Sequence, residues 1–212
     1  ILCYRDYGNS QRGMAIVGTV SGTSISFGSE ATITAGTATS TSVTCDPNTA
    51  NKFVVFSRDG GVSNYGIARV GTVSGTSISF GTSVTFNSDV TTYISGAFDP
   101  NTANKCVVAY QDTGNSSRGT VCLGTVSNTS ISFGSEVIFN VEQSHHVSMA
   151  FDPSTTGKFV VNYMDVGNGY KGYSSLGTLS GSSISFVTSV PFTACLLYTS
   201  DAADDLLCVD LG

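Results

Sequence analysis

The 212-residue sequence is short of charge, of tryptophan and of long apolar segments. Nine residues are Lys or Arg and they form no basic stripe, so a nucleic-acid-binding surface is not expected. No apolar run approaches the roughly 20 residues of a membrane-spanning helix, so membrane insertion is not expected either. Helical periodicity is also missing over any useful length. These absences favour a β-rich protein over a helical, membrane-spanning or nucleic-acid-binding one.

The sequence instead repeats one pattern along its length. GTVSGTSISFG begins at Gly18 and again at Gly71, and close variants begin at Gly124 and Gly177, so the period is 53 residues without insertion or deletion. Segment 1–13 keeps the same register with the later copies. The chain therefore starts inside a repeat and holds two full copies and parts of others.

Each copy predicts four short strands. In the fourth, large apolar residues alternate with serine, which is the signal of a half-buried strand. The first carries small side chains, as an innermost strand beside a crowded axis should. In one copy the four predicted strands are 92–99, 105–110, 119–126 and 130–139.

Turn residues recur at fixed positions of the repeat. Asn tolerates positive φ as Gly does, so two positions that alternate between Asn and Gly predict left-handed residues in tight hairpins. An Asp ahead of the first hairpin position can close an Asx turn. The first hairpin position holds Asn51, Asn104 and Gly157, the Asp position holds Asp46, Asp99 and Asp152, and the second hairpin position holds Gly22, Gly75, Asn128 and Gly181.

The strands and turns together predict the fold class. A third hairpin, at 112–119, makes each copy a four-stranded antiparallel meander, which is typical of a β-propeller blade. We expect an all-β, incomplete and open β-propeller of about four blades over residues 1–194, with blades starting near residues 40, 93 and 146 and a partial blade at 1–33. A β-solenoid is the alternative. Because such an arc lacks ring closure, its unclosed blade edges are expected to favour self-association.

The last 18 residues do not follow the repeat. CLLYTSDAAD resembles the translated end of a transposon-type sequencing-library adapter. The resemblance implies that residues 195–212 are a non-native tail, which is excluded from fold reasoning. The alternative is a real C-terminal extension.

Four cysteines precede this tail, and none recurs between copies. A disulfide framework would recur with the repeat, so we expect buried free thiols that pack as small hydrophobic groups. One chance disulfide pair remains as the alternative. The four are Cys3, Cys45, Cys106 and Cys122.

Candidate binding residues lie in the loops that enter the first strand of each copy. These loops, 34–40, 87–93 and 140–146, differ most between copies while the strands barely change, as on a binding surface built on a rigid scaffold. Ser40, Tyr93 and His146 share one repeat position, expected at the mouth of the axis, where Tyr93 and His146 could stack on a sugar or contact a peptide. Adjacent side chains of a strand point to opposite faces, so His145 and His146 do not predict a metal site.

A second set of loops joins the second and third strands. Each holds an Asp followed two residues later by Gly, and we interpret Asp6, Asp59, Asp112 and Asp165 as turn-forming residues. Calcium needs several oxygen ligands, so one carboxylate per loop does not predict a metal. Further candidate ligand-binding residues of these loops are Arg58, Tyr65, Arg118, Tyr170 and Lys171.

No catalytic residue and no cofactor are predicted. Glycoside hydrolysis needs a carboxylate pair at a set separation, and Glu30 and Glu136 instead share a scaffold position. No nucleophile elbow or phosphate-binding loop appears. The segment SRDGG around Asp59 resembles part of the Asp-box of sialidase-like propellers, without its Thr-Trp ending, and implies that Asp59 is a turn element.

Over residues 1–194 the pattern FDPNT-x-NK-x-VV-x-Y-x-D-x-GN, followed by GTVSGTSISFG, resembles a repeat abundant in marine phage and environmental proteins. Such proteins are often described as tail-fibre-like or propeller proteins. Together with the variable loops, the resemblance leads us to expect a non-catalytic propeller for adhesion or receptor binding on a virion surface or in an extracellular setting. The expected partner is a cell-surface glycan or envelope component. The alternatives are a purely structural repeat spacer and a fragment of a sialidase-like glycoside hydrolase.

Overall fold

A computed structural model of the chain describes residues 1–192, so the predicted non-native tail at 195–212 lies outside the described residues. The described part is all-β, as predicted, with one short 3-10 turn, η1 (Gly60–Val62). No helix in it is long and apolar enough to cross a membrane. The strands are β1 (Leu2–Asp6), β2 (Arg12–Ile16), β3 (Gly18–Ser21), β4 (Ser24–Phe27), β5 (Ala31–Cys45), β6 (Lys52–Asp59), β7 (Tyr65–Ser74), β8 (Ser77–Phe80), β9 (Val84–Phe98), β10 (Lys105–Asp112), β11 (Arg118–Ser127), β12 (Ser130–Phe133), β13 (Val137–Phe151), β14 (Lys158–Asp165), β15 (Lys171–Ser180), β16 (Ser183–Phe186) and β17 (Val190–Pro191).

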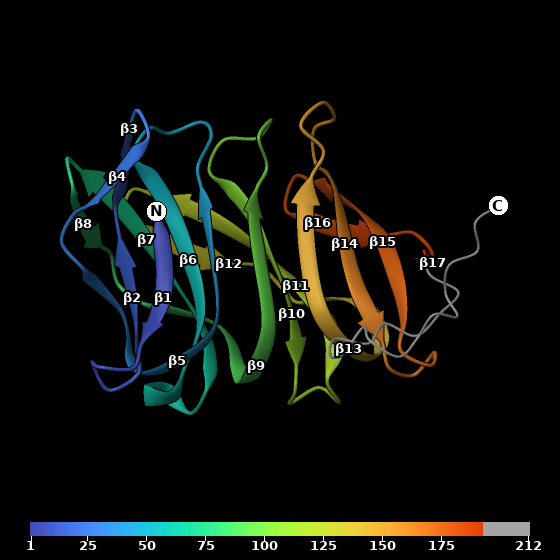
Figure 1. Cartoon of the computed structure of the whole chain (residues 1–212). Coiled ribbons are helices and arrows are strands. Elements are labelled where there is room, and N and C mark those ends of the chain that lie inside the picture. The colour runs from blue at the N-terminus through green and yellow to red at the C-terminus, as the bar shows by residue number, and fades with distance from the viewer. Residues whose placement is uncertain (193–212) are drawn as a thin grey trace.

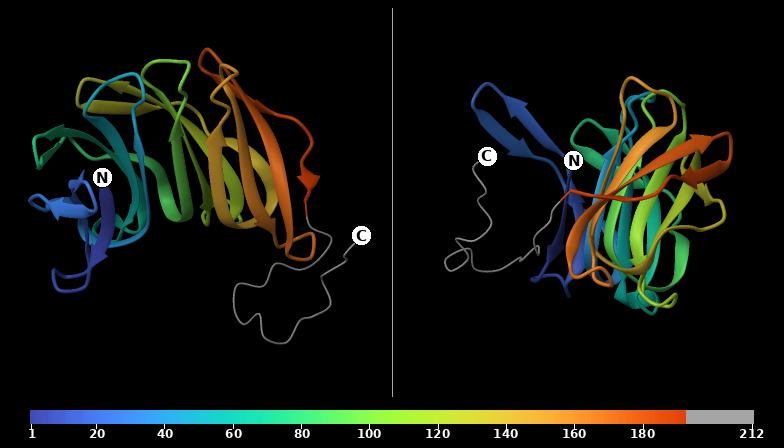
Figure 2. Two further views of the ribbon diagram at one scale, coloured as in Figure 1. Left: turned by 45° about the horizontal axis from the view of Figure 1, so that its top comes forward. Right: turned by 90° about the vertical axis from the view of Figure 1, so that its right-hand side faces the viewer.

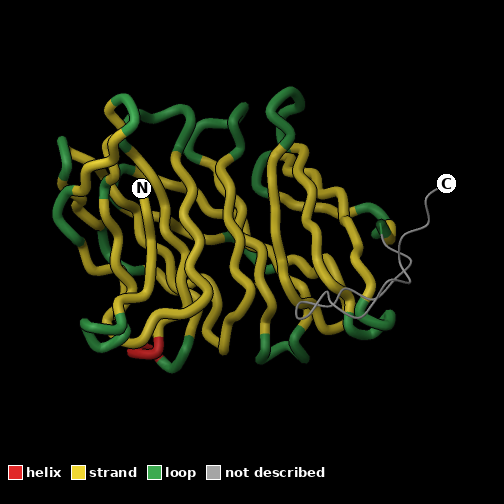
Figure 3. The backbone as a smooth tube through the Cα atoms, viewed as in Figure 1, coloured by secondary structure: helices red, strands yellow, loops and turns green. Residues whose placement is uncertain are grey.

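The strands form one large antiparallel sheet that does not close (Figures 1 and 3). Its hydrogen-bonded order is β1-β2-β5-β6-β7-β9-β10-β11-β13-β14-β15-β16, and β8, β12 and β17 pair with β7, β11 and β15. Strands β3 and β4 make a separate two-stranded sheet. Successive repeats follow an open curve whose two ends do not meet (Figure 2).

Three long strands connect one repeat to the next. β5, β9 and β13 are each 15 residues long. The first part of β9 pairs with β7, whereas its second part pairs with β10. The segments 34–40, 87–93 and 140–146, predicted as loops, therefore lie inside continuous strands, and this prediction was wrong. The predicted fourth strand at 130–139 is also interrupted, because β12 ends at Phe133 and β13 begins at Val137.

A bulge interrupts each long strand at the same repeat position. Ser40, Tyr93 and His146 have φ values of 51°, 50° and 51°, which place them in the left-handed region that non-glycine residues rarely occupy. The strand register shifts at the same point, for example between His145 and Ser148. An extra residue of this kind bends the strand and re-aims its side chains.

The predicted turn residues are confirmed. Both alternating Asn/Gly positions have positive φ in every copy, for example 62° at Asn104 and 55° at Asn128. The Asx turns also form: the backbone N–H of Asn101 donates to the Asp99 carboxylate at 2.9 Å, and the equivalent bonds reach Asp46 and Asp152. The sequence thus fixes the hairpins through local backbone chemistry.

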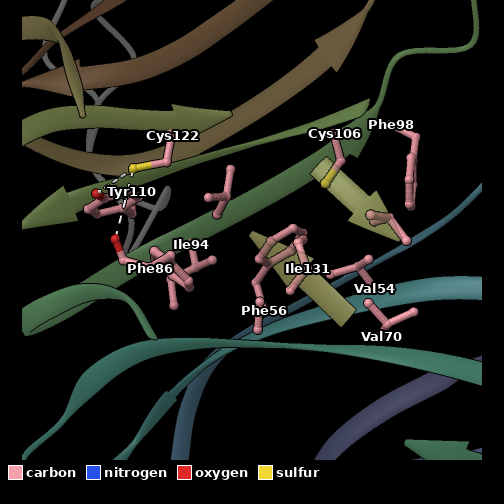
Figure 4. Close-up of a cluster of buried hydrophobic side chains, with 13 residues drawn as sticks. Val54, Phe56, Val70, Phe86, Ile94, Phe98, Cys106, Tyr110, Cys122 and Ile131 are labelled. Carbon is pink, nitrogen blue, oxygen red and sulfur yellow. Dashed lines mark hydrogen bonds between the residues drawn. The ribbon is translucent and has the colours of Figure 1, made fainter. Parts of the chain in front are cut away.

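Apolar side chains fill three cores, each between two successive repeats. Alternate residues of β10 point to different cores: Cys106, Val108 and Tyr110 face the preceding repeat, and Val107 and Ala109 face the following one. Figure 4 shows the core between the first two full repeats. The other two cores join the partial N-terminal repeat to the first full repeat and the second full repeat to the third.

The cysteine prediction is confirmed in part. All four described cysteines are free, and Cys106 and Cys122 are buried. Burial raises the pKa of the Cys106 thiol to about 12, so it packs as a neutral hydrophobic group. Cys45 is exposed and Cys3 is half-buried, so the expected burial is wrong for Cys45 and incomplete for Cys3.

Candidate functional site

Three rings gather where β9 and β13 bulge. The Tyr93 ring centroid lies 5.0 Å from that of His145 and 5.1 Å from that of His146, and the two imidazoles are 6.2 Å apart. We call Tyr93, His145 and His146 the ring cluster. Its rings are tilted against one another, as is common for interacting aromatic side chains. Tyr93 and His146, which share one repeat position, thus lie side by side in the structure.

The bulge brings the two histidines together, contrary to the prediction. Regular strand alternation would place His145 and His146 on opposite faces. His146 instead has a left-handed backbone, so both imidazoles contact the same Tyr93 ring. Among the residues the structure describes, no group of three or more His, Cys, Asp or Glu side chains is placed to hold a metal ion.

Polar groups that the sequence did not single out surround the cluster. The Gln143 side chain lies with its Nε2 atom 2.8 Å from Nε2 of His145. Thr92, next to Tyr93, donates its hydroxyl to Oε1 of Gln111 at 2.5 Å. Gln111 is buried, and its Nε2 atom has no hydrogen-bond partner among residues 1–192. Thr92 and Gln111 are neighbours because they pair across β9 and β10. Predicting this contact would have required the register of those two strands.

His145 is expected to titrate below its usual range. Partial burial, and then the charge of neighbouring His146, lower the pKa of His145 from 6.5. The contact with Gln143 agrees, because a neutral imidazole nitrogen accepts the amide N–H whereas a protonated one cannot. Well above pH 6.5 the ring is neutral in both folded and unfolded chains. As the pH falls below 6.5 the unfolded chain takes up the proton first, so the fold loses stability.

A histidine NMR titration tests this expectation. The midpoint of His145 should lie below 6.5, and His145→Gln should remove part of the acid-side decrease in unfolding free energy. The same substitution at His146 serves as the comparison. A His145 midpoint at or above 6.5 would contradict the burial argument.

Ser40 occupies the equivalent bulge of β5. It is half-buried, and as a serine it adds no third ring-bearing bulge to those of β9 and β13. Neighbouring long strands are linked by side chains of the predicted small-residue positions. The backbone N–H of Gly96 donates to Ser42 Oγ at 3.1 Å, and that of Met149 donates to Ser95 Oγ at the same distance. These bonds fix β5, β9 and β13 side by side, and thus fix the spacing of the bulges.

One residue of the second predicted set pairs with a strand neighbour of the ring cluster. Arg118 pairs in register with Gln143, which contacts His145. Its Nε donates to the Val141 carbonyl at 3.2 Å, and its Nη1 donates to Asn115 Oδ1 at 3.3 Å. Arg118 is therefore related to the cluster through its strand pairing with Gln143, while its guanidinium bonds to Val141 and Asn115.

The other members of that set lie at two other connections, β6–β7 and β14–β15. Arg58 donates from Nε to Asn64 Oδ1 at 3.1 Å within its own β6–β7 connection. Tyr65 and Lys171 begin β7 and β15, and Tyr170 is an exposed turn residue with φ 59°. No contact in the described structure joins these four to the ring cluster.

The carboxylates of the loops serve as structural acceptors. Asp6, Asp59 and Asp112 each accept the backbone N–H of the Gly two residues later, at 2.8, 2.8 and 3.1 Å, which confirms the turn interpretation. Asp165 forms a variant of the turn, in which Asn168 donates from its backbone and from its side chain.

The repeated glutamate also has a scaffold contact. Tyr110 donates its hydroxyl to Glu136 Oε1 at 2.8 Å, and Tyr4 donates to Glu30 at the equivalent position. In the third, partial copy Tyr163 donates instead to Ser189 at 2.9 Å. Because a serine replaces the carboxylate in one copy, the contact needs an acceptor rather than an acid.

Comparison with known proteins gives little further information. No protein-family model and no curated protein matches the chain. Two chains of solved structures match. One is Sqt1 from Chaetomium thermophilum, with 15% sequence identity and a TM-score of 0.47, covering 70% of this chain and 34% of that one. The chain thus spans about a third of the length of that structure, and this similarity identifies neither a family nor a function.

Proposed function

We propose that the chain is part of a non-catalytic β-propeller that binds a cell-surface glycan or envelope component through the ring cluster. Each 53-residue copy would be one blade, and the three cores would be the contacts between neighbouring blades. The protein would act in adhesion or receptor binding, on a virion surface or in an extracellular setting, as the resemblance to tail-fibre-like repeats suggests.

The observation that carries the proposal is the conformation of the ring cluster. Tyr93 and His146 both hold bulky rings at left-handed backbone positions, where such residues are uncommon. Strained backbone tends to be retained at functional sites, where it pre-organises side chains. A sugar ring presents an apolar face that packs on aromatic rings, and hydroxyls that Gln143, His145 and Arg118 could meet.

The carboxylates support a binding function over hydrolysis. Glu136 accepts from Tyr110, and Asp59 and Asp112 accept from turn amides. A glycoside hydrolase needs two carboxyl groups facing one bond at a set separation. The described residues use these acids to hold turns and neighbouring strands.

A glycan array followed by titration of the best ligand tests the proposal. Tyr93→Ala and His146→Ala should each weaken binding about tenfold or more, which corresponds to about 1.4 kcal/mol. Tyr7→Ala is the control, because Tyr7 is an exposed tyrosine of the partial N-terminal repeat. Binding that survives both cluster substitutions would remove the site assignment. A folded chain that binds no array member would favour the structural-spacer alternative.

A further inference from the structure

The turn between β14 and β15 carries the one Asn-Gly pair of the sequence, Asn168 and Gly169 (Figure 1). Both residues are exposed. The equivalent turns of the partial N-terminal repeat and of the second full repeat hold Asn9 and Asn115, each followed by serine. Both of these asparagines are half-buried. The three turns therefore allow one asparagine position to be compared with and without a glycine after it.

The residue after the asparagine has a left-handed backbone in all three turns. Its φ is 53° at Ser10, 57° at Ser116 and 75° at Gly169. A Cβ atom on Gly169 would meet no other atom within 4 Å, so the space around the turn does not require glycine. What distinguishes Gly169 from the two serines is that it has no side chain beside its backbone nitrogen. A group that approaches this nitrogen therefore meets less steric hindrance than at Ser10 or Ser116.

The turn at Asn168 is also held by fewer backbone hydrogen bonds. In the turn at Asn115 the backbone N–H of Arg118 donates to the Asn115 carbonyl at 3.2 Å, and the N-terminal copy has the same bond. Among residues 1–192 no equivalent bond joins Lys171 to Asn168. The backbone at Asn168 is thus less constrained, and its side chain can turn toward the amide nitrogen that follows it.

We propose that Asn168 is a site of spontaneous covalent modification, at which the side-chain amide is lost and the residue becomes aspartate or isoaspartate. The backbone nitrogen of Gly169 bonds to Cγ of Asn168, and the Cγ–Nδ2 bond breaks. The proton of the attacking nitrogen passes through solvent to the ammonia that leaves. No oxidant or reductant is needed, and the proposal is independent of the ring cluster and its ligand.

Water completes the reaction by opening the cyclic imide that this step leaves. Attack at the former side-chain carbonyl gives aspartate with the original main chain. Attack at the former main-chain carbonyl gives isoaspartate, in which the main chain runs through the old side chain and is one carbon longer. Because Asn168 and Gly169 are exposed, water has access to both carbonyl groups. Either product carries a carboxylate in place of the amide.

This carboxylate would face a buried acid. Asp165 is 2% exposed, and its carboxylate accepts the backbone N–H of Asn168 at 3.3 Å and its Nδ2 at 2.7 Å. Within residues 1–192, Asn168 supplies all the hydrogen bonds that this carboxylate accepts. Replacing the donor amide by a second carboxylate removes the shorter bond and sets two negative charges against each other. The modification should therefore release the turn from Asp165.

The side chain of Asn115 has the opposite role in its own turn. Its Oδ1 atom accepts from Nη1 of Arg118 at 3.3 Å, and a carboxylate there would still accept this bond. The neighbouring acid, Asp112, accepts from the backbone of Gly114 and from the side chain of Asn87, both at 3.1 Å. Loss of the Asn115 amide should therefore disturb its turn much less than the same change at Asn168.

Peptide mapping by mass spectrometry, after incubation of the full chain at mildly alkaline pH, tests the reaction. Asn168 should be converted about tenfold or more faster than Asn115, which corresponds to about 1.4 kcal/mol in activation free energy. Gly169→Ser should slow Asn168 to the rate of Asn115, and Ser116→Gly should speed the reaction of Asn115. Equal wild-type rates at the two asparagines would overturn the proposal. So would a failure of either glycine–serine exchange to change the rate of the asparagine before it.

Urea unfolding tests the consequence at Asp165. Asn168→Asp should lower the urea midpoint, whereas the matched control Asn115→Asp should change it little. Incubated wild-type protein should shift toward the midpoint of Asn168→Asp as conversion proceeds, and incubated Gly169→Ser protein should keep its starting midpoint. Equal midpoints for the two aspartate variants would overturn the expected release of the turn, because the Asn168 amide would then contribute nothing to holding Asp165.

Discussion

Truncation of Phe56 to alanine should lower the free energy of unfolding by about 3–5 kcal/mol. The Phe56 side chain is fully buried in the core between the first two full repeats (Figure 4). Its ring packs edge-on against Phe86 at 6.0 Å and lies directly over the backbone of Gly96. Removing the ring loses its transfer free energy and leaves a cavity between two repeats that cannot fully collapse.

Urea unfolding measures this effect, and Phe27→Ala is the matched control because Phe27 is 58% exposed. The comparison should be made at a concentration at which the chains are monomeric. The Phe27 change should alter stability far less than the Phe56 change, with similar m values for the variants. Equal losses at the two positions would contradict the assignment of Phe56 to a tightly packed core.

A double substitution shows whether the ring and Gly96 share one space. A Cβ atom added to Gly96 would lie 2.3 Å from the Phe56 ring, so Gly96→Ala alone should destabilise the fold by about 1–3 kcal/mol. In the Phe56→Ala background the new methyl group enters the vacated volume. The double variant should therefore be more stable than the sum of the two single losses predicts. Simple additivity would mean that the two residues do not interact.

Loss of the Asp59 carboxylate should be the second large effect, with Asp59→Ala lowering stability by about 3 kcal/mol. The buried carboxylate accepts three backbone N–H groups, from Ala35 and Gly36 on β5 and from Gly61 in its own turn, at 2.8–2.9 Å. Alanine leaves these donors without an acceptor, and unsatisfied buried donors are costly. The β6–β7 turn should also lose its attachment to β5.

Two further variants control the Asp59 experiment in urea unfolding. Asp59→Asn keeps one acceptor oxygen and should fall between the wild type and Asp59→Ala. Asp6→Ala removes the equivalent acid of the partial repeat, for which one backbone donor, that of Gly8, is seen in the described structure. It should cost no more than about 1 kcal/mol. An Asp6 loss as large as that at Asp59 would show that the extra bonds to β5 contribute nothing.

The sequence predicted those features that depend on local chemistry. Asn51, Asn104 and Gly157 share a positive φ because few residue types tolerate that conformation, and exchange between Asn and Gly reveals it. Asp99 caps its turn for an equally local reason. The all-β class followed from alternation with a period of two.

The features that the sequence did not predict depend on contacts between repeats. The segment 87–93 is polar and variable, so it was expected to be a loop, yet both of its neighbours supply hydrogen-bond partners that extend β9 through it. The bulge at His146 then breaks the alternation that had separated the two imidazoles. Strand alternation, in which side chains switch faces at every residue, cannot anticipate where an extra residue will interrupt it. The sequence therefore indicated Tyr93 and His146 as candidates but not the contact of His145 with them.

The long strands have a consequence for how such a gene can change. Each of β5, β9 and β13 belongs to two sets of strand pairs at once, and the bulge lies within the second set. An insertion of one codon on either side of the bulge would turn the following side chains to the wrong face of one set. Unequal recombination between copies preserves both registers when it adds or removes whole 53-residue units. We therefore expect natural length variants of this array to differ by complete repeats, while substitutions accumulate at exposed positions within an unchanged frame.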